Sequence, residues 1–229
     1  MIPSCRRGFP VLLALLLLTG RALAGSFSPD STGHSLLSRK DLWYGAAAVA
    51  SVALATRLDG WAADEAPEMN SSAARRISAN VGRLGSPLTW APLLILGGAA
   101  GAIAGHPERE RSLLRVTAGV LGASAAAGAL KLAIGRARPY QTPGDTDVYR
   151  PFSGFSSFPS GHTTFAFALA AGIDRETKAK WVPWVVYPLA GAVGWSGLRD
   201  GQHWTSDVVG GATLGFWTAR KVVGYLRAR

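Results

Sequence analysis

The stretch Phe158-Pro159-Ser160-Gly161-His162 lies where a polar segment of the chain meets an apolar one. Residues 140–157 before it are rich in Pro, Gly, Ser, Asp and Tyr, whereas Thr163 to Ile173 after it are almost wholly apolar. This boundary predicts a helix that starts at Gly161 with Ser160 as its N-cap. The first helical turn has unpaired backbone N–H groups, which together with the helix dipole favour binding of an anion.

His162 follows the glycine at the mouth of this predicted helix, where its imidazole could act on a bound anion. Taken alone, the stretch is equally well explained as a capped helix with an incidental surface histidine. Two further clusters of polar residues decide between these interpretations.

The first cluster contains Lys131 and Arg138, seven residues apart and followed by Pro139. Seven residues make almost two helical turns, which predicts that both side chains lie on the same side of one helix, about 10 Å apart. Because proline disfavours helix at the preceding residue, this helix is expected to end at Arg138 and to present its last side chains to the loop. Alone, the cluster is typical of a basic helix end that complements the dipole.

The second cluster contains Ser196, His203 and Asp207. His203 and Asp207 are four residues apart and would share a face if the backbone were helical there. A carboxylate on one imidazole nitrogen fixes the tautomer and makes the other nitrogen more basic, as a nucleophilic histidine requires. The alternative is a helix capped by Ser206 or Asp207 beside a structural histidine.

In this order, the clusters resemble the signature of the type 2 phosphatidic acid phosphatase superfamily. That family contains membrane lipid phosphate phosphatases, soluble bacterial acid phosphatases and vanadium haloperoxidases. Its pattern is Lys, six residues, Arg-Pro; then Pro-Ser-Gly-His; then Ser-Arg, five residues, His, three residues, Asp. The first two blocks match fully and the third matches at Ser196, His203 and Asp207, so the resemblance spans roughly residues 125–215.

The sequence departs from the family pattern at Gly197, where the family has arginine after the serine. Arg199 is the nearest guanidinium and is expected to take over the phosphate contact if the loop bends. The alternative is that Arg199 faces solvent or pairs with Asp200, which would leave one phosphate contact missing.

The resemblance implies that His203 attacks phosphorus to form a phosphohistidine and that Asp207 orients it. His162 would protonate the leaving oxygen and then activate water. The implied phosphate ligands are Lys131, Arg138, Ser160, Gly161 and Arg199. These groups would supply the charge stabilisation that Mg²⁺ supplies in other phosphoryl-transfer sites. No metal and no cofactor is expected, because no cluster of residues resembles a metal-ligand set and the other histidines, His34 and His106, lie outside the motifs.

The expected fold is all-α, a bundle of about six helices with the active site at its loop-bearing end. Two uncharged stretches, 85–105 and 181–198, are long enough to span a bilayer, whereas other apolar stretches are shorter. Mean hydropathy is only +0.17. We expect a membrane-embedded bundle and keep a soluble bundle as the alternative.

The N-terminus predicts a secretory signal peptide over residues 1–24, followed by one phosphatase domain over 25–229. A basic start, an apolar core and the cleavage site Ala22-Leu23-Ala24 carry this interpretation, and an anchoring helix is the alternative. Within the domain, 25–41 is expected to be loosely ordered and 112–226 to hold the motifs. Cys5, the only cysteine, lies in the signal segment, so no disulfide is expected in the mature chain.

Charge distribution predicts the orientation in the membrane. Lys and Arg are frequent in the turns at 106–111 and 174–180, which places the loops at 135–160 and 198–206 on the other side, outside. The expected location is therefore the bacterial inner membrane with the site facing the periplasm. If the signal is cleaved, the mature chain starts outside, and the number of membrane crossings agrees with this orientation only if the helix at 42–55 lies along the surface. The alternatives are that the signal is retained or that no helix spans the membrane.

A net charge of +10 favours anionic partners, but the basic residues are too scattered for a nucleic-acid-binding arm. The expected substrates are a polyprenyl diphosphate, phosphatidic acid or phosphatidylglycerol phosphate, approached from the bilayer surface. The alternatives are a soluble periplasmic acid phosphatase of broad specificity and, outside enzymes, a membrane scaffold whose site is damaged at Gly197. The chain is short for a haloperoxidase.

Overall fold

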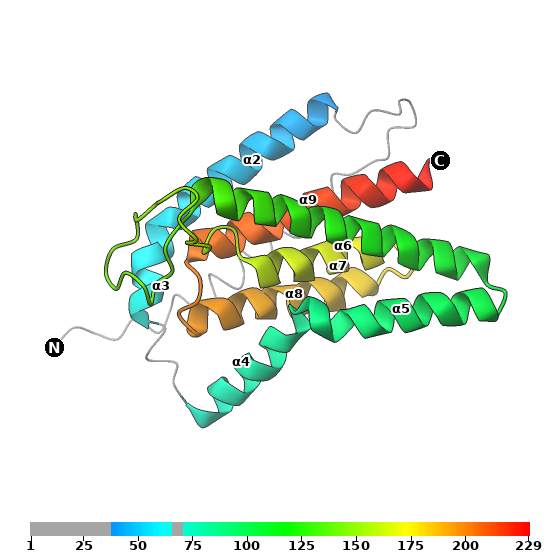
Figure 1. Cartoon of the computed structure of the whole chain (residues 1–229), viewed down its shortest axis with the longest axis horizontal. Helices are drawn as coiled ribbons and strands as arrows, with labels where there is room; N and C mark the ends of the chain where they lie inside the picture. The colour runs from blue at the N-terminus through cyan, green and yellow to red at the C-terminus, as the bar shows by residue number, and fades with distance from the viewer. Residues whose placement is uncertain (1–37, 66–70) are drawn as a thin grey trace. The chain divides into compact units, whose positions relative to one another are not determined.

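A computed structural model describes residues 38–65 and 71–229 (Figure 1). Over these residues the regular structure is helical, with one isolated bridge between Arg136 and Tyr149, so the all-α prediction is confirmed. The elements are α2 (Arg39–Ala55), a 3₁₀ turn (Thr56–Leu58), α3 (Asp59–Glu65), α4 (Ser72–Leu84), α5 (Pro87–Ile103), α6 (Pro107–Ile134), α7 (Gly161–Glu176), α8 (Val182–Arg199) and α9 (Thr205–Arg227). The predicted signal peptide lies outside the described residues.

Helix α7 is the central helix of the bundle and packs against α6, α8 and α9. Ten consecutive residues, Thr163 to Gly172, are buried, so the helix is enclosed on all sides. Small residues make this packing close: Ala168 and Ala171 are fully buried, and Gly215 of α9 faces the backbone of Thr164. Alanine and glycine residues therefore lie where the helices cross and allow their backbones to approach closely.

Helix α6 differs from its prediction at both ends. It begins at Pro107, so five of the residues predicted as a charged turn, 107–111, form its start, where proline and two glutamates suit a helix N-terminus. It ends at Ile134 because Gly135 adopts a left-handed conformation (φ 57°) and donates its N–H to the carbonyl of Lys131. Lys131 and Arg138 therefore do not lie on one helix, and that prediction was wrong.

The helices before α6 also differ from the sequence interpretation. In the mixed, charged stretch 59–84 the sequence indicates one short amphipathic helix, over residues 73–81. The structure has α4 there, longer at both ends, and also α3, which the pattern does not predict. Figure 1 shows α3, the α6–α7 loop and the α8–α9 turn at one end of the bundle and the α5–α6 connection at the other.

Helix α2 is attached to α9 through a buried carboxylate. Asp41 accepts hydrogen bonds from Lys221 Nζ (2.6 Å) and Trp217 Nε1 (3.1 Å). Most other side chains of α2 are exposed, including large apolar ones.

Large apolar side chains are exposed along several helices. They include Leu42, Trp43, Leu88, Ile95, Leu96, Leu121, Leu132, Trp181 and Trp184. So many exposed large apolar side chains on several helices favour contact with a membrane or another apolar partner.

By length and mean hydropathy, α6 is the described helix that can cross a bilayer alone. Helix α4 and residues 87–101 of α5 pass the same test together, with a bend of 45° between them. The predicted span at 85–105 is thus one half of a bent pair, and α8, at 181–198, is not apolar enough to qualify by itself.

The close crossing of α7 and α9 is testable at Gly215. A Cβ at this position would overlap the backbone oxygen of Thr164, so Gly215→Ala is expected to destabilise the fold by about 1–3 kcal/mol. Gly128→Ala on α6 is the matched control, because its Cβ would meet no atom within 4 Å and alanine favours helix by about 1 kcal/mol. Thermal unfolding in detergent measures both, and equal midpoints would contradict this packing.

Candidate active site

The N-terminus of α7 has the predicted cap. Ser160 is extended, and its Oγ accepts a hydrogen bond from the N–H of Thr163 (3.4 Å) and one from the Thr163 hydroxyl (2.8 Å). The N–H of Ser160 donates to the carbonyl of Asp207 (3.0 Å), which joins the start of α7 to the start of α9. A phosphate contact by Ser160 must therefore use its hydroxyl, while Gly161 presents an N–H of the first turn.

Two predicted cationic ligands have neutral partners. Lys131 Nζ donates to the carbonyl of Ser156, and its Cε lies 3.6 Å from where a Cβ on Gly161 would be, so Lys131 packs beside the first residue of α7. Arg138 Nη1 donates to Gln202 Oε1 (2.7 Å). Both cations therefore keep their charge available for an anion beside the mouth of α7.

Arg199 lies in a different environment from these two cations. Its Nη1 is 2.5 Å from Asp200 Oδ1, and Asp200 also accepts a hydrogen bond from the Ser78 hydroxyl of α4 (2.8 Å). This is the pairing that the sequence left open as the alternative to phosphate binding. A Cβ on Gly197 would lie 3.3 Å from His203 Cδ2, so the position of the family arginine adjoins the histidine.

His203 is buried, with 6% of its surface exposed, and its Nδ1 is 3.7 Å from Asp207 Oδ2. Within the described residues, Nδ1 makes no hydrogen bond. Burial lowers the pKa of His203 below its ordinary 6.5; Asp207 opposes this effect, and Lys131 and Arg138 add to it. A neutral imidazole at neutral pH is the form that a nucleophile requires.

His162 is the second residue of α7 and is exposed, in contrast to His203. Gly161, the residue before His162, adjoins Lys131, and the N–H of Ser160 donates to the carbonyl of Asp207. Arg138 is hydrogen-bonded to Gln202, the residue before His203. The structure thus brings these predicted residues together.

Asp207 is held by three side chains or backbone groups besides His203. Its Oδ2 accepts hydrogen bonds from the Ser157 hydroxyl and the N–H of Trp204 (2.9 Å), and its Oδ1 accepts one from Arg136 Nη1 (2.8 Å). Asp207 is the third residue of α9 and reaches back over the helix start, whereas His203 precedes the helix. The shared face was expected only if the backbone were helical from His203 to Asp207. It is not, and the two residues meet through a helix cap.

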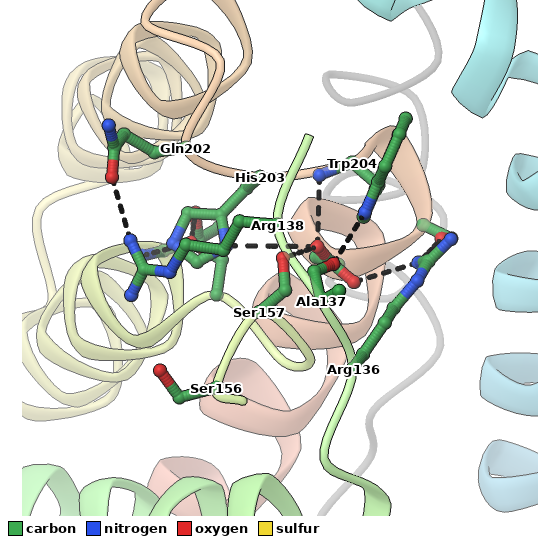
Figure 2. A network of polar contacts seen from close by, with 12 residues as sticks. Arg136, Ala137, Arg138, Ser156, Ser157, Gln202, His203 and Trp204 are labelled. Atoms are coloured by element: carbon green, nitrogen blue, oxygen red, sulfur yellow. Dashed lines mark hydrogen bonds and ion pairs between the residues drawn. The ribbon is translucent and has the colours of Figure 1, made fainter. Parts of the chain in front are cut away.

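Arg136 and Asp59 belong to this site although the sequence patterns do not indicate them. Arg136 is 1% exposed and donates to Asp207 and, from Nη2, to Asp59 (2.8 Å). Figure 2 shows Arg136 on one side of the polar network and His203, Arg138 and Gln202 on the other. Arg136 is one of the six residues between Lys131 and Arg138 that the family pattern leaves unspecified. Asp59 lies outside the motifs, and no pattern in the neighbouring sequence marks it as a site residue.

A small cavity adjoins His203 between α3 and the end of α8. Its lining includes Asp59, Ala62, Pro139, Leu198, His203 and Thr205. Among the described residues, no group of three or more His, Cys, Asp or Glu is arranged to hold a metal ion.

An all-helical bundle that presents two histidines, an aspartate and cations at one helix mouth defines a phosphate-handling class of site. Residues 112–229, about half of the chain, match the model of the PAP2 superfamily, so the chain belongs to that superfamily. This confirms the resemblance drawn from the motifs.

Curated relatives are phosphatases by name. The chain is 34% identical to a lipid A 1-phosphatase of Porphyromonas gingivalis over 87 residues, which cover 37% of this chain and 17% of the relative. It is 37% identical to a decaprenylphosphoryl-5-phosphoribose phosphatase of Mycolicibacterium smegmatis over 113 residues, covering 49% and 59%. The chain thus spans less than two thirds of these relatives' length.

Among solved structures, the fold is similar to the crystal structure of a transmembrane PAP2-type phosphatidylglycerolphosphate phosphatase from Bacillus subtilis. The alignment covers 95% of this chain and 96% of that one, with a TM-score of 0.56 and 20% identity. The likeness extends to the helices that precede the family match.

The environment of His203 predicts a low pKa. NMR titration of the histidine ring protons, with the His203 signal assigned by its loss in His203→Asn, should give a pKa below 6.5. The imidazole then stays neutral as pH falls to that value and becomes charged only below it. A pKa at or above 6.5 would show that Asp207 outweighs burial and the two cations.

Proposed function

We propose that this protein is a metal-independent phosphatase that hydrolyses phosphate monoesters or diphosphates of lipids through a phosphohistidine. The observation that carries the proposal is the site itself: buried His203 beside Asp207, with Lys131 and Arg138 at the capped start of α7. The names of the relatives, which include lipid A and diacylglycerol pyrophosphate phosphatases, support a lipid substrate.

His203 is the proposed nucleophile. With Nδ1 turned to Asp207, the proton sits on Nδ1 and the lone pair of Nε2 attacks phosphorus. The N–P bond forms as the bond from phosphorus to the leaving oxygen breaks, and His162 donates a proton to that oxygen. His162 then takes a proton from water, whose oxygen bonds to phosphorus as the N–P bond breaks.

The non-bridging oxygens would be held by Lys131, Arg138, the Gly161 N–H and the Ser160 hydroxyl. Fixed positive groups of this kind stabilise the charge on a transferring phosphoryl group. Arg199 is a further proposed ligand, but it must release Asp200 to reach a phosphate. This difference separates Arg199 from Arg138, whose partner is a neutral amide.

The exposed apolar side chains support embedding in a membrane, and the span-length α6 supports the same conclusion. We propose the bacterial inner membrane, with the site facing the periplasm and residues 1–24 serving as a signal peptide. The basic residues near Pro107 and those at 174–180 lie at the far ends of α6 and α7 from the site. With 28 residues, α6 is about 42 Å long, so its basic start lies about that far from the site end of the helix. This separation suits a cytoplasmic side that carries the basic residues.

Phosphate release in the presence of EDTA tests the proposal. We expect turnover of undecaprenyl diphosphate in detergent to exceed that of a short water-soluble ester, and His203→Ala to abolish both while the helical circular dichroism is unchanged. Faster turnover of the soluble ester would favour a periplasmic acid phosphatase. Activity in His203→Ala would refute the mechanism, and no release by the wild type would favour a scaffold.

The cationic ligands are distinguished by a matched pair of variants. Arg138→Ala should raise KM for a phosphate ester at least about tenfold, because a charge-assisted contact of about 1.5–3 kcal/mol is lost. Arg199→Ala should weaken binding less, because Asp200 already neutralises Arg199. Inhibition by inorganic phosphate measures the same contacts without turnover. If the two variants weaken this inhibition equally, Arg199 leaves Asp200 and replaces the arginine missing at Gly197.

A further inference from the structure

Arg136 is a charged side chain enclosed almost completely by protein. Besides Asp207 and Asp59, it donates to the Ser206 hydroxyl (2.6 Å) and the carbonyl of Thr146 (2.8 Å). The rings of Tyr149 and Trp204 each lie 5.4 Å from its guanidinium carbon. Burying such a charge is costly unless it is paired and hydrogen-bonded, and here both terminal nitrogens are.

Asp59 is the less expected partner because it comes from α3, before the region that matches the family. It is fully buried and accepts hydrogen bonds from the N–H (2.8 Å) and hydroxyl (2.6 Å) of Ser206, in addition to Arg136. Ser206 is the residue before Asp207. Asp59 is therefore joined to the site aspartate both through the guanidinium and through the backbone of α9.

The charges alternate along this network. Asp59 lies on one edge of Arg136 and Asp207 on the other, and His203 follows Asp207. A guanidinium alone beside Asp207 would offset the negative electrostatic potential that Asp207 exerts at the imidazole of His203. The carboxylate of Asp59, on the opposite edge of the guanidinium, compensates the positive charge of Arg136 and so restores that potential.

We infer that Asp59 and Arg136 are positioning residues of this site: they fix Asp207 Oδ1 so that Oδ2 faces His203, and Asp59 preserves the charge that Asp207 presents to the imidazole. This inference rests on the proposed function for its catalytic consequence. A stabilising role alone is a poor explanation, because buried ion pairs are often no more stable than apolar residues of similar volume.

Other charged groups also face His203 and stay constant in the test. They are Lys131 from α6 and Arg138 from the α6–α7 loop; at the end of α8, Arg199 is paired with Asp200. A change confined to Asp59 leaves these groups in place, and the hydrogen-bonded connection from Asp59 to His203 runs through Arg136, Ser206 and Asp207.

The test is Asp59→Asn, which keeps the shape of the side chain and removes its charge. The pKa of His203 measured by NMR should fall below the wild-type value, since the uncompensated guanidinium disfavours the imidazolium. In the phosphatase assay, kcat should fall about 10- to 100-fold with KM nearly unchanged, and the acid limb of kcat/KM should move to lower pH.

Asp41→Asn is the matched control, because Asp41 is also buried and also joins an N-terminal helix to α9, through Lys221. It should lower the unfolding temperature without moving the His203 pKa or the pH profile. If Asp59→Asn does not fold, Ser206→Ala removes one link of the network and should shift the pKa in the same direction by less.

The outcomes separate the inference from the proposed function. A His203 pKa and pH profile in Asp59→Asn equal to the wild-type values would overturn the inference, as would the same shifts in Asp41→Asn. A wild type without phosphatase activity would refute the proposed function, while the NMR titration would still decide whether Asp59 acts on His203.

Discussion

One buried guanidinium between two carboxylates constrains the whole site end of the molecule. Arg136 lies within 2.8 Å of both Asp59 and Asp207, and neither carboxylate is exposed. Burying the charge of Arg136 is costly unless both carboxylates are in place. The segment after α6, which carries Arg136, must therefore lie between the start of α3 and the start of α9. The geometry of the proposed site therefore depends on a side chain, Arg136, that is not among the proposed phosphate ligands.

The second constraint is the contact between the starts of α7 and α9. The N–H of Ser160 donates to the carbonyl of Asp207, so the start of α7, which presents Gly161, is joined directly to the aspartate that faces His203. Buried small residues such as Ala168 and Gly215 keep the two helices close over the following turns. Such a site is organised before any phosphate binds, which is how fixed dipoles and charges lower a reaction barrier without reorganising.

The sequence was a good guide wherever the determinant was local. Ser160 caps α7 as predicted because a serine between a polar loop and an apolar run specifies that turn. It was a poor guide where a single backbone conformation decides: left-handed Gly135 ends α6 before Arg138, and the cap formed by Asp207 replaces a helical face. Asp59 is invisible to any local pattern because its partners, Arg136 and Ser206, lie 77 and 147 residues away.

The position of Asp59 in the chain means that the region matching the family model, residues 112–229, is not self-sufficient in this protein. Residues 112–229 contain Arg136 and Asp207, yet the carboxylate that balances this arginine is supplied from outside them. A chimera that joined this region to an unrelated N-terminal segment would inherit a buried positive charge with only one carboxylate opposite it. An N-terminal segment exchanged into this chain would therefore have to bring an acidic side chain to the same place. The match to the family model does not reveal this dependence between distant parts of the gene.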